Sequence, residues 1–371
     1  MPDLLLTDEQ ELLRRTARDF VERECPLAAV RRIDEDEAGF SPELWAKMAG
    51  LGWAGILVPT AYGGEGGALT DAAVLLEELG RGAVPGPYHS SAVTGALALL
   101  HAGSEEQKQR LLPALARGER IVTLAFTEAR YGWTPDDVRA AAKPGAGGGF
   151  VLDGTKAFVP DAAAASDLIV AARAGDALTL LTVDRQAPGV TLRPLPGFAG
   201  EPLFEVAFSG VEVAPDAVLG GGWEALEPAL DAAAALLCAS MAGAIRRVYE
   251  MSMTYARRRV QFGQPVARFQ RVQDRLIEML NAADAARWTA YEALWKLESG
   301  RPGAQEAVSV AKAVASEGFY RACEDAHHVH AGVGSDKAYG LYLYTKRSRS
   351  LYHHLGDPAH HRERLARLLG L

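Results

Sequence analysis

Cysteine is scarce in this sequence. Three cysteines stand far apart among 371 residues, and no pair has the Cys-x-x-Cys spacing that zinc and redox sites use. A disulfide framework is therefore not expected, and we expect buried free thiols in a reducing cytoplasm.

Long uncharged runs and an excess of positive charge are also missing. The apolar stretch 230–245 is shorter than the roughly 18 residues that mark a membrane span, so none is expected. The start of the chain carries acids where a secretion signal needs lysines. The net charge of −8 argues against a nucleic-acid partner, because phosphate contacts need a basic face. We therefore expect a cytoplasmic protein of two or three domains.

The pattern of apolar residues changes twice along the chain. The first 120 residues show helical spacing, and Thr7 with Gln10 and Ser104 with Gln107 form two capping boxes. From Ile121, β-rich runs alternate with Gly, Pro and Asp, and after about residue 219 long helical periods return. The expected fold is α+β: an N-terminal α-helical domain (1–120), a middle β-barrel-like or β-sandwich domain (121–219) and a C-terminal four-helix bundle (220–371).

Three glycine-containing stretches mark turns or links. Asp153-Gly154 stands between two apolar runs, which predicts a hairpin turn. Residues 142–150 have the composition of a flexible loop. The triplet 220–222 could cradle a phosphate, but no lysine and no strand–turn–helix context accompany it, so we interpret it as a linker.

Four histidines, His353, His354, His360 and His361, lie close together near the C-terminus. A metal site needs ligands that converge on one face, whereas adjacent histidines point about 100° apart on a helix. Residues 356–358 also interrupt the pattern, so no metal is expected. Histidine titrates near neutrality, so an acid–base role stays open beside a structural one.

The segment YARRRVQFGQPVARFQRVQ (255–273) joins a basic helix end to a Phe-Gly-Gln-Pro turn and a new helix. Three arginines at a helix C-terminus complement the helix dipole. The same guanidinium groups also suit a phosphate. This segment alone leaves both interpretations open.

Five segments, taken in order, resemble the acyl-CoA dehydrogenase family. They are GSEEQKQRLLPALARGE (103–119), FTEA (126–129), DGTKAFV (153–159), RxQFGxPxxxFQxxQ (259–273) and HAGVGSDKAYGLYLYTKR (330–347). The resemblance implies a tetrameric FAD flavoprotein that oxidises an acyl-CoA substrate to a 2-enoyl-CoA. In that reaction a glutamate removes the α-proton and flavin takes the β-hydride. An electron-transfer flavoprotein is the implied acceptor.

The resemblance divides the FAD contacts between two neighbouring chains. The share given to a neighbour's cofactor is matched by Arg259, Gln261, Phe262, Gln270, Gly332 and Gly334. The share given to the chain's own flavin is matched by Thr127 and by Phe158, the aromatic of a Trp-x-Thr motif. His328 stands where the family commonly has a glutamine.

The chain's own share departs from the family pattern. Trp133 stands in the register of a serine that touches FAD, and Pro160 replaces a hydroxyl donor. A buried group left unpaired costs about 1–3 kcal/mol, and tryptophan fills space that a flavin needs. The sequence therefore implies poor binding of its own flavin.

The family's catalytic glutamate is also absent. Leu355 and Gly356 occupy its usual register, and Ala233 occupies the alternative position on the long helix. Asp357, His354 and His353 are the nearest candidates for a replacement base, with Asp231 near the alternative position.

Three hypotheses follow from this pattern of matches and losses. The chain is the partner subunit of an α2β2 heterotetramer, giving FAD contacts in trans to a second dehydrogenase chain. Alternatively, it is a homotetrameric dehydrogenase with a non-standard base, or a CoA-binding scaffold without flavin.

Overall fold

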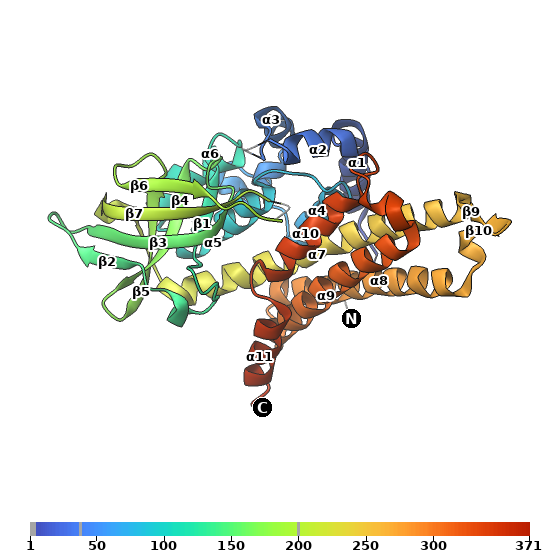
Figure 1. Ribbon diagram of the computed structural model, residues 1–371. Coiled ribbons are helices and arrows are strands. Elements are labelled where there is room, and N and C mark those ends of the chain that lie inside the picture. Colours follow the sequence, from blue (N-terminus) through green and yellow to red (C-terminus); the bar gives the residue numbers. More distant parts are fainter. Residues whose placement is uncertain (1–4, 37–38, 199–200) are drawn as a thin grey trace.

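The computed structural model describes residues 5–36, 39–198 and 201–371. N-terminal helices, a middle sheet and a long C-terminal bundle follow one another, and the bundle extends well beyond the sheet (Figure 1). This arrangement confirms the expected fold class. The N-terminal helices are α1 (Asp8–Glu24), α2 (Leu27–Asp34), α3 (Pro42–Gly50), α4 (Leu69–Arg81), the π-helical η3 (Tyr88–Gly95), α5 (Ala96–Ala102) and α6 (Glu105–Ala116).

Both capping boxes are confirmed. Gln10 N donates to Thr7 Oγ1 (3.2 Å), and Thr7 N donates to Gln10 Oε1 (3.1 Å) at the start of α1. Ser104 and Gln107 make the same reciprocal pair at the start of α6. Each box satisfies backbone donors that the first turn of a helix leaves free.

The middle region is a mixed sheet in the order β6-β7-β3-β2-β4-β5-β8, with β1 parallel to β4. Its strands are β1 (Val122–Ala125), β2 (Ala141–Pro144), β3 (Phe150–Pro160), β4 (Asp167–Ala174), β5 (Ala177–Asp184), β6 (Val190–Pro194), β7 (Leu203–Val213) and β8 (Val218–Leu219). The buried residues of β4 and β5 belong to one hydrophobic core with the helices.

The expected hairpin turn at Asp153-Gly154 is wrong. Both residues lie inside β3, where the pairing with β7 shifts register as in a β-bulge. Gly154 has a φ of +142°, and a Cβ there would stand 2.7 Å from the Cα of Ala140. The glycine is therefore required by close backbone approach. The turn joins β2 to β3 instead, where Gly145 N donates to Gly149 O (2.9 Å), so the expected loop 142–150 begins with strand residues.

The C-terminal bundle contains α7 (Gly222–Arg258), α8 (Gln270–Glu298), α9 (Ala304–His330), α10 (Leu341–His353) and α11 (Pro358–Leu368). The short strands β9 (Val260–Gln261) and β10 (Gln264–Pro265) form a hairpin between α7 and α8. This hairpin lies at the opposite end of the bundle from the sheet (Figure 1).

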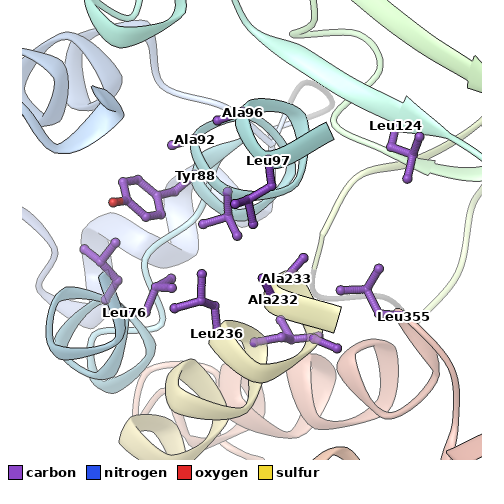
Figure 2. Packing of buried hydrophobic residues seen from close by; sticks show 14 of the residues in the cluster. Leu76, Tyr88, Ala92, Ala96, Leu97, Leu124, Ala232, Ala233, Leu236 and Leu355 are labelled. Carbon is purple, nitrogen blue, oxygen red and sulfur yellow. The ribbon is translucent and has the colours of Figure 1, made fainter. Parts of the chain in front are cut away.

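Helix α7 is long and apolar enough to cross a membrane by length and composition, with a window of mean hydropathy 1.6. However, 83% of that window is buried inside the fold, as in a core helix. Figure 2 shows Ala232, Ala233 and Leu236 of α7 facing Leu76 of α4 and residues of η3 and α5. The three cysteines are free and buried as predicted, and burial raises the pKa of each thiol to about 12.

Candidate active site

The loop between α10 and α11 carries the position of the missing glutamate. Leu355 is 4% exposed and has a φ of +58°, and Figure 2 shows it in the same hydrophobic cluster as Ala233 of α7. Ala233 is fully buried. Both positions where the resemblance placed a base therefore present apolar side chains to the same part of the core.

Lys312 of α9 anchors this loop, and sequence reasoning missed it. Its fully buried Nζ donates to Gly356 O (2.8 Å) and to Ser316 Oγ (2.8 Å). The carbonyls of Leu351 and Tyr352 lie 3.2 and 3.3 Å away. Burial lowers the pKa of this ammonium to about 8. A lysine one helix away gave no sequence signal, because only the fold brings α9 against the end of α10.

The candidate replacement bases occupy three different environments. Asp357 Oδ1 accepts a hydrogen bond from His360 N (2.8 Å) and caps α11. His353 is exposed, with Nδ1 4.0 Å from Asp357 Oδ2. His354 is partly buried among aromatic rings, and burial lowers its pKa well below the ordinary value. Among the described residues, no group of three or more His, Cys, Asp or Glu could hold a metal ion.

A cavity of about 530 Å³ lies between the N-terminal helices, the end of β3 and the bundle. Asp161 lines it, and Ser90 Oγ donates to Asp161 Oδ2 (2.6 Å). Burial raises the pKa of Asp161 to about 7. Arg347 also lines the cavity, is 7% exposed, and has no hydrogen-bond partner for Nη1 among the described residues. Asp161 directly follows Phe158-Val159-Pro160, so its neighbours were considered in the sequence while the acid itself was missed.

A second cavity of about 420 Å³ lies between the loop 133–136 of the middle domain, the first turns of α7 and α11. Asp231 lines it and is 5% exposed. Its two carboxylate oxygens accept hydrogen bonds from Arg364 (2.5 and 2.8 Å). A bidentate pair of this kind is short and directional, so Asp231 is committed to α11.

Aromatic rings separate the two cavities. Trp133 stacks on Phe126 with centroids 5.6 Å apart and planes 6° apart. The rings of Tyr131 and His354 are each T-shaped to Trp133, with centroids 6.2 and 5.8 Å from the Trp133 centroid. Phe126 also meets Trp223, and Tyr131 meets Phe158. We call these six residues the ring cluster: Phe126, Tyr131, Trp133, Phe158, Trp223 and His354.

The ring cluster stands where the chain's own flavin contacts were expected. Phe158 belongs to it, and Thr127 follows Phe126 directly. Thr127 is buried and its Oγ1 donates to Ala157 O (2.6 Å), so the hydroxyl holds β3. Because rings fill the space beside both expected contacts, the residues present do not fit a flavin in this crevice.

The β9–β10 hairpin offers the opposite environment. Arg259, Gln261 and Gln270 are exposed, and Phe262 is 91% exposed with a φ of +53°. Among the described residues, none makes an ion pair or hydrogen bond with the Arg259 side chain. Gln261 Nε2 donates to Val260 O (2.8 Å). An unpaired guanidinium beside exposed amide side chains fits a pyrophosphate.

The glycine turn after α9 lies close to the hairpin. Arg259 N donates to Tyr255 O (2.8 Å), and the ring centroids of Tyr255 and His330 lie 4.6 Å apart. His330 immediately precedes the turn of Gly332 and Gly334. A Cβ on Gly332 would meet nothing within 4 Å, so its backbone is open to approach. His328 is exposed on the last turns of α9. These contacts place the Arg259 end of the hairpin near the Gly332 turn. Gly334 is buried, and a Cβ there would stand 2.8 Å from His327 Nδ1.

Comparisons with known proteins cover nearly the whole chain. Family models match the acyl-CoA dehydrogenase N-terminal domain at residues 7–119, the middle domain at 123–211 and the C-terminal domain at 220–370. The probable acyl-CoA dehydrogenase YngJ of Bacillus subtilis is 32% identical over 91% of each chain.

Solved structures give the same result. The Tcur3481–Tcur3483 steroid ACAD variant has a TM-score of 0.89 at 30% identity, covering 98% of each chain. The ChsE4–ChsE5 complex of Mycobacterium tuberculosis has a TM-score of 0.91 at 27% identity, covering 100% of this chain and 99% of the other. The FAD complex of PigA has a TM-score of 0.90 at 25% identity and covers 100% of each chain.

Proposed function

The chain belongs to the acyl-CoA dehydrogenase family of FAD-dependent oxidoreductases, which dehydrogenate acyl-CoA thioesters, and from this premise we propose that it is the partner subunit of a two-chain dehydrogenase. In this proposal a second chain supplies the catalytic base and the flavin crevice. This chain supplies the distal contacts to that cofactor and completes an α2β2 assembly.

The observation that carries the proposal is the contrast between two ends of one molecule. At the hairpin, the donors of Arg259, Gln261 and Gln270 are open to solvent. In the crevice, rings fill the flavin space, and Leu355 and Ala233 offer no carboxylate. This chain offers the contacts for the phosphate end of a cofactor but no crevice for the flavin ring. It can therefore serve only a cofactor whose flavin ring is bound by another chain.

Geometry supports the trans assignment. Helix α7 has 37 residues, which at about 1.5 Å per residue spans roughly 55 Å. The hairpin at its C-terminal end therefore cannot reach the crevice beside its N-terminal half (Figure 1). FAD, when bound in the second chain, supplies the acceptor for the substrate's hydride. Arg259 and the glycine turn would hold its phosphate end. The ChsE4–ChsE5 structure is itself a complex of two named proteins, which supports such an assembly.

The test is flavin content, measured by absorbance for the chain alone and for the chain co-expressed with a second dehydrogenase chain from its genomic neighbourhood. We expect a colourless lone chain and a yellow, active complex. Arg259→Ala should lower flavin retention in the complex at least ~10-fold, because a charge-assisted hydrogen bond contributes about 1.5–3 kcal/mol. Arg193→Ala, which removes an exposed arginine of the sheet, is the matched control. Unchanged flavin content in Arg259→Ala would count against the trans role.

The competing homotetramer with its own base makes different predictions. Asp357, His354 or His353 would then act on the substrate, and near-stoichiometric flavin would accompany the lone chain. The N-cap role of Asp357 and the ring contacts of His354 give both side chains structural work instead. A CoA-binding scaffold would remain colourless with any partner. An electron-transfer flavoprotein as the acceptor of the complex stays a prediction.

A further inference from the structure

The ring cluster joins the middle domain to the bundle. Phe126, Tyr131, Trp133 and Phe158 come from the middle region, whereas Trp223 begins α7 and His354 follows α10. His89 at the start of η3 belongs to the N-terminal part of the chain, and its ring centroid lies 5.7 Å from the ring centroid of His354. The rings therefore bridge all three parts of the chain.

The loop that carries Trp133 is pinned from several sides. Asp137 Oδ2 accepts hydrogen bonds from Thr134 Oγ1 (2.6 Å) and Thr134 N (3.0 Å). The Arg173 guanidinium donates to Pro135 O (2.5 Å) and to Val138 O (3.3 Å). Gly132 packs so closely that a Cβ would stand 1.9 Å from the Asp137 carboxyl carbon. A loop held in this way keeps the indole of Trp133 in the crevice.

The rings also divide the space between the domains. Tyr131 and His354 line the larger cavity, and Trp133 and Leu355 line the smaller one. None of the residues that the structure describes lines both cavities. A flavin ring is planar and wide, so it would need Trp133 and Tyr131 to leave this wall together.

We propose that the ring cluster is a permanent clasp that occupies this chain's own flavin crevice and fastens the middle domain to the bundle without a cofactor. The clasp makes the chain stable on its own and leaves the hairpin end of the bundle, with the glycine turn after α9, to contact a cofactor. Together with the proposed function, the clasp implies one flavin for every two chains in the assembled complex. This stoichiometry rests on the proposed function.

The first experiment asks whether the crevice opens. The full chain is titrated with FAD while the emission of Trp133 is followed as the difference between wild type and Trp133→Phe. The clasp predicts a blue-shifted emission that saturating FAD does not quench, and an unchanged Tm. Quenching of this difference emission together with an FAD-dependent rise in Tm would overturn the proposal.

The second experiment measures the fastening. Trp133→Ala should lower the Tm of the lone chain by about 5 °C or more, because a large ring leaves a packed site. Trp288→Ala, which removes a 43% exposed indole of α8, should shift Tm by less than about 2 °C. If Trp133→Ala does not fold, Trp133→Phe keeps an aromatic ring at this position. Its Tm should fall by less than the roughly 5 °C expected for Trp133→Ala. Equal shifts in Trp133→Ala and Trp288→Ala would contradict the clasp.

Flavin counting separates this proposal from the proposed function. One flavin per chain in the purified complex would overturn the clasp. A lone chain indifferent to FAD, combined with an Arg259→Ala complex that retains its flavin, would overturn the trans role and leave the clasp standing.

Discussion

At the scale of single residues, Asp161 combines burial, strain and an unusual proton affinity. It has a φ of +53°, which few residues other than glycine adopt. Its carboxylate accepts a hydrogen bond from Ser90, and Glu201, which also lines the cavity, acts on it with like charge. These features make Asp161 a source of pH-dependent stability in a chain whose usual base is absent.

The sign of that dependence follows from the pKa. Burial raises the pKa of Asp161 from 3.8 to about 7, so between these values the folded state holds a proton that the unfolded state has lost. The free energy of unfolding should therefore fall as pH rises from about 4 to about 7, by roughly 3–4 kcal/mol in total. Asp161→Asn should remove this slope. Denaturant unfolding across this pH range measures it, and parallel curves for wild type and variant would contradict the assignment.

At the scale of elements, α4 and α7 cross with their backbones in close approach. A Cβ on Gly80 would stand 1.9 Å from Ser240 O, and one on Gly243 would stand 1.9 Å from Glu77 O. The glycines thus explain why the middle of α7 is rich in small residues. Larger side chains there would push the helices apart.

Gly243→Ala should therefore lower the free energy of unfolding by roughly 2–3 kcal/mol. The matched change is Gly318→Ala in α9, where a Cβ would meet its nearest atom at an ordinary 3.4 Å. There the better helix propensity of alanine should be neutral or add up to about 1 kcal/mol. Urea unfolding of both variants checks the difference, and similar losses would show that the crossing is not the cause.

Helix starts and turns could be predicted where residues close in sequence determine them. They were harder to predict where a residue distant in sequence packs against the segment. Thr7 with Gln10 signals a helix start through contacts three residues apart. Gly154 was mistaken for a turn residue because its requirement comes from Ala140 across the sheet. At the candidate site, the motif register predicts Leu355 and Ala233 at the positions of the family's carboxylates. The packing of Trp223 and His354 around Trp133 could not be seen, because the three come from separate parts of the chain.

At the scale of the whole molecule, charge is unevenly distributed. The chain has a net charge of −8, yet the exposed residues 257–259 at the hairpin end are three consecutive arginines. An anionic cofactor held by an adjoining chain would meet a local positive field on an otherwise acidic protein.

Salt should therefore speed the loss of flavin from the assembled complex. Raising KCl from about 0.05 to 0.5 M shortens the range of exposed charges from roughly 14 to 4 Å, so we expect the release rate to rise several-fold. Arg259→Ala should blunt this response, and the Tm of the lone chain serves as the control. A release rate independent of salt would argue that apolar contacts retain the flavin.

The close crossing of α4 and α7 has a mechanical consequence. From Gly243 to the end of α7 at Arg258 the helix continues for fifteen residues, a lever arm of about 22 Å. A tilt of about 5° at the pivot would displace the hairpin by about 2 Å, enough to break a hydrogen bond. In the proposed assembly, side-chain volume at this crossing would therefore set the position of the hairpin against the second chain. A substitution deep in this chain's core would then lower the activity of its partner.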